Sequence, residues 1–164
     1  MNGCSSVLKR LLTLFLCSLL LTLTSCTIET PAENELVYTF FDLDGAEAAV
    51  LQCGEMSALI DCGVSASFFE LSAELDRRGI RSLDYFILTH PHNDHIGCAD
   101  EVLRHYKPQT VIYPPLPKGR SDFSHIQNLA AALGSKNKIV RGGDSIRFGC
   151  ASIDVFAPNS LTAP

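Results

Sequence analysis

Apolar and polar positions follow a strand-like pattern in the first part of the folded region. Residues 37–44 (VYTFFDLD), 47–53 and 56–62 (MSALIDC) are short apolar segments separated by short turns. Segments of this length and spacing predict three successive strands. We expect the second and third to form a hairpin that turns at Gly54 and Glu55.

Helical and strand patterns alternate along the rest of the chain. Residues 65–80 carry apolar side chains at mostly helical spacing, and Gly79 marks the end of that helix. Residues 83–90 have a continuous apolar centre, which is typical of a strand buried on both faces. Further helices are expected at residues 98–106 and 122–134, and further strands at residues 110–114, 138–143, 145–149 and 151–158. This order predicts an α/β fold in which helices cover a mixed sheet.

The N-terminal segment is set apart from the fold by its composition. Lys9 and Arg10 precede an uncharged, mostly apolar run over residues 11–24. A helix of this length spans about 21 Å, less than the roughly 30 Å of a bilayer core, so a secretory signal is favoured over a membrane span.

The end of the apolar run indicates how the signal is processed. The sequence LTSC resembles the lipobox of bacterial lipoproteins, which implies a signal peptide at 1–25 and lipid attachment at Cys26. Residues 26–35 would be a polar tether and residues 36–164 the folded domain. The resemblance implies an exported protein, anchored by its lipid on the outer face of a bacterial membrane. Ordinary signal cleavage without a lipid, or an uncleaved anchor, are the alternatives.

Composition limits the function classes further. The chain has 164 residues, 46% of them hydrophobic, and a formal charge of −5, which fits one domain with a packed core. An acidic chain of this kind lacks an overall electrostatic footprint for nucleic acid.

Four cysteines lie in the predicted folded domain at residues 36–164. In the predicted hairpin Cys53 lies opposite Met56, and Cys62 lies opposite Glu47. The two sulfur atoms would be about 20 Å apart along the ladder, too far for a disulfide. The other pairings among Cys53, Cys62, Cys98 and Cys150 stay open.

The densest cluster of ionisable side chains is LTHPHNDHIG, residues 88–97, which we call the histidine loop. Pro91 keeps His90 extended, so His90 and His92 can point the same way. After a turn, Asp94 and His95 lie at the start of the next helix. They can face a second cation position next to the one that His90 and His92 face. Imidazole and carboxylate groups are ligands for Zn²⁺, and also for Fe or Mn. The spacing therefore predicts a metal site built from these four residues.

The histidine loop resembles the H-x-H-x-D-H metal-binding motif of the metallo-β-lactamase fold superfamily. ALIDCG, residues 58–63, is similar to an earlier strand motif of that family, which implies that Asp61 supports the metal ligands without binding metal. The opening strands together with THPHNDHIG most resemble the extracellular metallo-β-lactamase-like domain of ComEC-type DNA-uptake proteins. The resemblance implies an αββα sandwich, of which this chain holds mainly the N-terminal half.

The family resemblance also implies a reaction. Two metal ions would share a hydroxide that attacks an ester-like bond, with His90 and His92 on one metal, and Asp94 and His95 on the other. Asp94 would also orient the hydroxide, as the catalytic residue. The ComEC-like features favour a phosphodiester substrate, either a small molecule or nucleic acid. The alternatives are a β-lactam hydrolase and a half-domain that binds metal or a partner without catalysis.

Several positions depart from the family pattern. No residue after Asp94 matches the later aspartate and histidine that complete the family site, and Asp144 is interpreted as part of a turn before a strand hairpin. His105 and His125 are interpreted as surface or capping residues. Cys98 stands where the family often has glycine, either as a small wall residue or as an extra ligand. A half-sandwich would leave an apolar sheet face open to pairing or aggregation.

Overall fold

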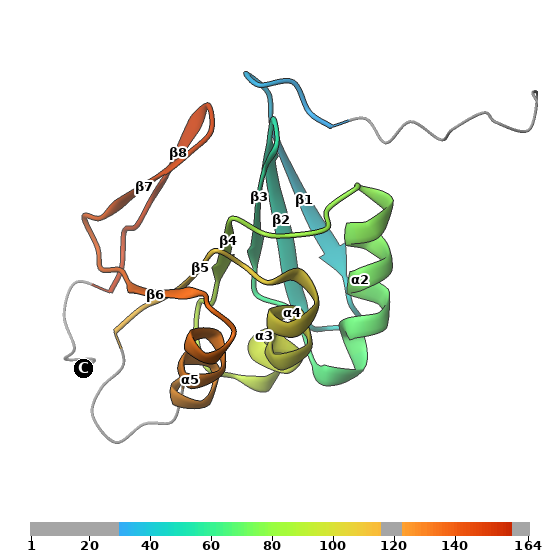
Figure 1. Ribbon diagram of the computed structural model, residues 1–164, viewed down its shortest axis with the longest axis vertical. Helices are drawn as coiled ribbons and strands as arrows, with labels where there is room; N and C mark the ends of the chain where they lie inside the picture. The colour runs from blue at the N-terminus through green and yellow to red at the C-terminus, as the bar shows by residue number, and fades with distance from the viewer. Residues whose placement is uncertain (1–29, 116–122, 159–164) are drawn as a thin grey trace, which may run out of the picture.

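The computed structural model describes residues 30–115 and 123–158. Its centre is a six-stranded sheet in the order β1-β2-β3-β4-β5-β6 (Figure 1). The first three strands are antiparallel neighbours, whereas β3 to β6 run parallel. The bounds are β1 Leu36–Asp42, β2 Glu47–Cys53, β3 Met56–Ile60, β4 Tyr85–Ile87, β5 Thr110–Tyr113 and β6 Lys136–Ile139.

Helices cover one face of this sheet. They are the 3₁₀ turn η1 (Ser65–Ser67), α2 (Phe68–Arg77), α3 (Asn93–Ile96), α4 (Ala99–Tyr106) and α5 (Ser124–Ala132). Leu71 of α2, Val102 of α4 and Ala130 of α5 belong to one buried cluster with Leu59 and Phe86 of the sheet. Because parallel strands need crossover connections, the segments containing α2, α4 and α5 link β3 to β6. The mixed α/β fold predicted from the sequence is confirmed.

The opposite face of the sheet is covered only in part. A second, two-stranded sheet of β7 (Ser145–Phe148) and β8 (Ala151–Asp154) packs there (Figure 1). Phe148 contacts the cluster of Leu51 and Ala58, and Ile146 packs with Ile112. On the same face, the side chain of Phe40 in β1 remains 75% exposed.

One disulfide joins the two sheets. Cys53 at the end of β2 is bonded to Cys150 in the turn between β7 and β8, with 6.4 Å between their Cα atoms. The predicted register, with Cys53 opposite Met56, is confirmed, and Cys62 is a free, buried thiol. The expectation that Cys53 and Cys62 do not pair is therefore correct.

Two strands around the predicted site are shorter than the sequence pattern indicates. Residues 83–90 were expected as one strand, but β4 ends at Ile87. The amide of Thr89 donates to Asp61 Oδ1 at 2.9 Å, so it leaves the ladder. In the same way β3 ends at Ile60, because Asp61 has a left-handed backbone with φ of 54°.

The strand expected at residues 138–143 is wrong in its second half. β6 ends at Ile139, and Arg141 to Asp144 form a turn in which the Asp144 carboxylate accepts from the amide of Arg141 at 2.8 Å. The interpretation of Asp144 as a turn residue before a hairpin is confirmed.

The proposed signal peptide at 1–25 and Cys26 lie outside the described residues. Within residues 30–115 and 123–158, no helix has both the length and the apolar character needed to cross a bilayer.

Candidate metal centre

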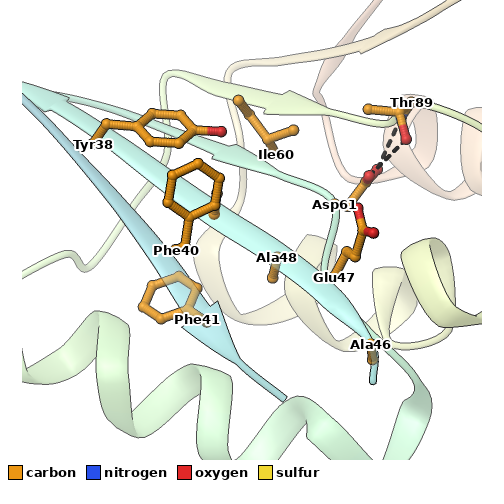
Figure 2. A pocket seen from close by; sticks show the side chains of 10 residues that line it. Tyr38, Phe40, Phe41, Ala46, Glu47, Ala48, Ile60, Asp61 and Thr89 are labelled. Carbon is orange, nitrogen blue, oxygen red and sulfur yellow. Dashed lines mark hydrogen bonds between the residues drawn. The ribbon is translucent and has the colours of Figure 1, made fainter. Parts of the chain in front are cut away.

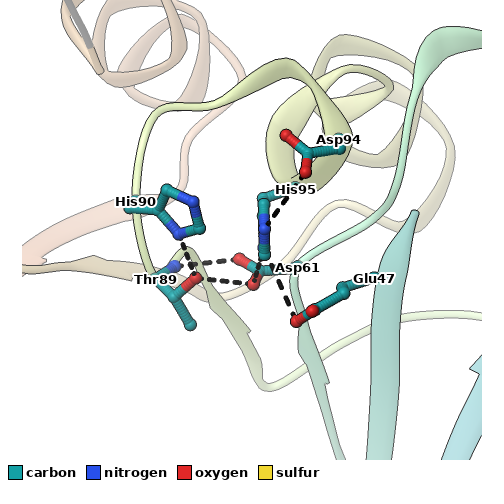
Figure 3. Close-up of polar contacts among 6 residues, drawn as sticks. All are labelled: Glu47, Asp61, Thr89, His90, Asp94 and His95. Atoms are coloured by element: carbon teal, nitrogen blue, oxygen red, sulfur yellow. Dashed lines mark hydrogen bonds and ion pairs between the residues drawn. The ribbon is translucent and has the colours of Figure 1, made fainter. Parts of the chain in front are cut away.

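The histidine loop lies at the carboxyl ends of two neighbouring parallel strands. Asp61 directly follows β3, and the loop begins directly after β4. The carboxyl ends of parallel strands in α/β sheets are where ligands commonly bind. Topology therefore brings Asp61 beside Thr89 and His90, although they are far apart in the sequence (Figure 3).

Asp61 is the buried anchor of the site, with only 3% of its surface exposed. Oδ1 accepts the amide of Thr89 at 2.9 Å, and Oδ2 accepts the Thr89 hydroxyl at 2.6 Å. His95 Nδ1 lies 2.8 Å from Oδ2. Because both oxygens are already engaged, this carboxylate is suited to orienting the loop rather than to binding an ion itself.

The hydrogen bonds also fix which ring nitrogens carry protons. Thr89 has one hydroxyl proton, which it donates to Asp61, so its oxygen can only accept from His90 Nδ1 at 3.0 Å. His95 Nδ1 likewise donates to the Asp61 carboxylate. We infer that both rings donate from Nδ1, so that the neutral form of each ring has its lone pair on Nε2. An imidazole Nε2 in this state is a good metal ligand.

The side chains predicted to bind metal gather in one place. The ring centroids of His90 and His92 are 4.6 Å apart, and those of His90 and His95 are 3.8 Å apart. His95 Nε2 lies 3.6 Å from Asp94 Oδ2. His95 is buried, whereas His92 and Asp94 are exposed and His90 is half-buried. This donor set of imidazole nitrogens and a carboxylate fits a divalent metal, and the assignment of individual ligands stays a prediction.

Backbone contacts hold the loop against the sheet. The carbonyl oxygen of His92 accepts the amides of His95 and Ile96 at 3.0 Å, which starts the short helix α3. The amide of Gly97 donates to Gly63 at 2.8 Å. A Cβ atom at Gly97 would lie 2.4 Å from the Asn93 carbonyl oxygen, so this close approach requires glycine.

Glu47 is a member of the site that the sequence reasoning missed. Glu47, Asp61 and His95 each bring a potential ligand atom within 4.8 Å of one another. Since the Asp61 carboxylate and His95 Nδ1 already bond each other, Glu47 adds a further carboxylate beside the metal centre. Glu47 Oε2 lies 3.9 Å from His95 Nδ1, and its side chain is 76% exposed. The predicted hairpin register could have identified Glu47, because it placed Glu47 opposite Cys62, the neighbour of Asp61.

The remaining candidates lie in other contacts. Cys98 is buried and its thiol donates to the carbonyl oxygen of Cys62 at 2.8 Å, which fits a small wall residue. Burial, and then the neighbouring Cys98, raise the pKa of the Cys62 thiol. His125 Nε2 lies 2.9 Å from the Asp100 carboxylate, and the His105 ring packs against an aromatic neighbour.

Comparison with known proteins identifies one family. A family model described as the metallo-beta-lactamase superfamily matches residues 47–148, which include β2 to β7 and the whole histidine loop.

Two curated relatives align with parts of the chain. "ComE operon protein 3" of Bacillus subtilis is 29% identical over 86 residues, 52% of this chain and 11% of the relative. "Hydroxyacylglutathione hydrolase" of Buchnera aphidicola is 32% identical over 98 residues, 60% of this chain and 32% of the relative. The chain thus spans less than a third of the length of either relative.

Solved structures have the same fold. The "MIM-2 Metallo-Beta-Lactamase" superimposes with a TM-score of 0.57 at 19% identity, over 80% of this chain and 52% of that chain. At this identity the similarity establishes the architecture alone.

Proposed function

The chain belongs to the metallo-beta-lactamase superfamily, and from this premise we propose that it is a metal-dependent hydrolase of ester-like bonds. The observation that carries the proposal is the arrangement of His90 and His95. Both are held at Nδ1 by a hydrogen-bond network that begins at Asp61, and both leave Nε2 available.

Four side chains would hold the metal, namely His90, His92, Asp94 and His95. Zinc suits this set of nitrogen and oxygen donors, and two ions would fit the family pattern, with Mn or Fe as alternatives. A bound divalent ion lowers the pKa of a water molecule toward 7 and stabilises developing negative charge. The Asp94 carboxylate, which is exposed and lies 3.6 Å from His95 Nε2, would orient the attacking water.

Phosphodiesters are the substrate class that we propose first. The similarity to ComE operon protein 3 over 52% of the chain supports the ComEC-like assignment made from the sequence. A hydroxyacylglutathione thioester is the second candidate, because a relative of that name aligns over 60% of the chain. Metal binding without turnover is a third candidate, because among the described residues the group that could hold a metal ion includes none after His95.

A test combines metal content with turnover. We expect the purified chain to retain zinc after dialysis and to cleave bis(4-nitrophenyl) phosphate, with activity removed by a chelator and restored by zinc. Hydroxyacylglutathione and nitrocefin measure the thioester and lactam alternatives in parallel. His92→Ala should lose both metal and activity, whereas His105→Ala, outside the histidine loop, should lose neither. Retained zinc with no turnover of any substrate would support the binding-only candidate, and a folded chain without zinc would contradict the metal site.

We also propose that the chain is exported and anchored through a lipid on Cys26. The LTSC sequence supports this, and the Cys53–Cys150 disulfide fits an oxidising compartment. Labelling of cells with a radioactive fatty acid should mark the wild-type chain and leave Cys26→Ser unmarked. Equal labelling of both would contradict a lipid at this position.

A further inference from the structure

The N-terminal tether and the candidate metal centre lie at opposite ends of the β2–β3 hairpin. The chain enters β1 at Leu36, which pairs with Cys53 at the end of β2. Glu47 begins β2 and Asp61 directly follows β3, so we call this opposite end the metal end. Tyr38 of β1 lies toward the tether, whereas Glu47 and Asp61 lie together at the metal end (Figures 1 and 2). The seven residues of β2 place about 20 Å between the two ends.

The tether is fixed where it meets the sheet. Cys53 Sγ lies 3.3 Å from the carbonyl oxygen of Glu33, and a Cβ atom at Gly54 would lie 3.4 Å from Cα of Glu33. Thr30 lines the same pocket as Cys53 and Gly54. The disulfide from Cys53 to Cys150 ties the β7–β8 turn to this place as well. We call the end of the domain formed by Thr30, Glu33 and Gly54 the tether end.

The proposed lipid is close to the tether end. Cys26 is four positions before Thr30, and four residues of fully extended chain reach at most about 14 Å. The tether end is therefore held near the bilayer surface when Cys26 carries a lipid. The metal end is about 20 Å further along β2, on the side of the domain away from this short link.

Charge opposes an orientation in which the domain lies flat on the membrane. Removal of Lys9 and Arg10 with the proposed signal peptide changes the formal charge of the chain from −5 to −7. An acidic domain is repelled by an anionic bilayer surface. The arginine cluster at residues 77–81 forms ion pairs with Glu74 and Asp76, so its charge is already compensated.

We propose that the lipidated chain is oriented with its tether end toward the bilayer and its metal end toward the aqueous compartment. A phospholipid headgroup and a water-soluble phosphodiester offer the same bond to the metal centre. This orientation selects the soluble one, because headgroups of the anchoring bilayer lie at the other end of the domain. The inference rests on the proposed lipid at Cys26 for the anchor and on the proposed function for the reaction.

A fluorophore at each end of the lipidated chain measures the orientation. Glu55→Cys lies in the exposed β2–β3 turn at the tether end, and Ala66→Cys lies in η1, which bonds the histidine loop through Ser65 and Gly97. The native thiols of Cys62 and Cys98 are buried, so the label is directed to the introduced cysteine. Each labelled chain is inserted into vesicles of phosphatidylethanolamine and phosphatidylglycerol that carry a quencher on the headgroup.

We expect quenching at position 55 to be at least about twofold stronger than at position 66, because about 20 Å separates the two ends. A matched variant lengthens the link. Insertion of about 15 Gly and Ser residues after Glu29 adds roughly 20 Å of flexible reach, so quenching at position 55 should fall toward that at position 66. An unchanged difference in the lengthened chain would contradict the role of the short link.

A second measurement identifies the source of the substrate. Vesicles that carry the zinc-loaded chain should cleave bis(4-nitrophenyl) phosphate added to the water and leave their own phosphatidylglycerol intact. The Cys26→Ser chain, which lacks the lipid, should cleave the soluble substrate at the same rate as the wild-type chain. Hydrolysis of the phosphatidylglycerol in the anchoring vesicle would contradict the proposed orientation.

The quenching measurement also separates this inference from the two proposals beneath it. Equal quenching at positions 55 and 66 would mean that the domain lies on its side, and stronger quenching at position 66 would place the metal centre at the bilayer. Either result would overturn the inference even if soluble substrate is hydrolysed. The expected quenching without turnover of any substrate would refute the proposed function alone. A wild-type chain that does not associate with vesicles would refute the anchor and the orientation together.

Discussion

His95 Nδ1 lies 2.8 Å from Asp61 Oδ2, and both residues are buried, with 8% and 3% of their surfaces exposed. The same carboxylate accepts the hydroxyl of Thr89, which in turn contacts His90 Nδ1. One aspartate at the end of β3 therefore orients two imidazoles of the histidine loop. This arrangement makes the geometry of the candidate metal centre depend on a residue that need not touch the metal.

Asp61→Asn should weaken metal binding about 10- to 100-fold, because an asparagine cannot accept hydrogen bonds at both terminal atoms. Zinc affinity is measured by competition with a chromogenic chelator. Asp84→Asn is the matched control, since Asp84 also accepts a backbone amide, that of Ser57 at 2.9 Å, but lies away from the histidine loop. Equal loss of affinity in both variants would show that the effect is one of general stability.

Thr89→Val should release His90 without disturbing His95. The variant removes the hydroxyl that accepts from His90 Nδ1, so the ring of His90 should populate both neutral tautomers. Nitrogen-15 shifts of the imidazole in the metal-free chain report this directly, and zinc affinity should fall less than in Asp61→Asn. Thr89→Ser keeps the hydroxyl and should behave as wild type. If His90 in Thr89→Val still had a single tautomer protonated at Nδ1, the role of the Thr89 hydroxyl in orienting this ring would be contradicted.

Sequence patterns predicted the elements around the site well, because each has a strong local signal. The hairpin register with Cys53 opposite Met56 and the helix now seen as α4 follow from apolar periodicity alone. Strand ends were less predictable. Asp61 and Thr89 leave the sheet to bond each other across two strands, and that interaction is not encoded in either segment taken separately.

The site was predicted only in part, because only some of its residues are neighbours in the sequence. His90, His92, Asp94 and His95 are close in the sequence, so their convergence could be expected from one short loop. Glu47 reaches the site from β2, a strand distant from the histidine loop in the sequence. Register links Glu47 to the neighbourhood of Asp61, but the sequence pattern alone does not show which carboxylates reach a histidine.

Gly97→Ala should damage both the fold and the metal centre. The added Cβ would lie 2.4 Å from the carbonyl oxygen of Asn93 and 2.7 Å from Cα of Val64, which are backbone atoms that cannot turn aside. We expect a loss of about 2–3 kcal/mol in the free energy of unfolding, measured by urea denaturation. Gly134→Ala introduces no such clash, although its φ of +90° makes it strained. The control should therefore lower stability without changing zinc affinity, and unchanged zinc affinity in Gly97→Ala would contradict the role of this contact.

Cys62 and Cys98 should be unreactive in the folded chain. Both are fully buried, and burial raises the pKa of Cys62, so little thiolate forms at pH 8. Iodoacetamide labelling followed by peptide mass spectrometry should find both unmodified under native conditions and modified in guanidinium chloride. Rapid native labelling of Cys62 would mean that the end of β3 opens frequently.

Reduction of the Cys53–Cys150 disulfide should loosen the β7–β8 hairpin first. The bond spans 97 positions in the sequence, and closing a loop of that length stabilises a fold by about 4–5 kcal/mol in the chain-entropy model. Apolar contacts of Phe148 and Ile146 with the large sheet would then hold the hairpin alone. We expect Cys53→Ser with Cys150→Ser to lower the free energy of unfolding by about 2–5 kcal/mol in urea. Hydrogen exchange should rise in β7 and β8 more than in β3 or β4. Uniform exchange across both sheets would contradict a local anchoring role, because it would mean that the two sheets open together as one unit.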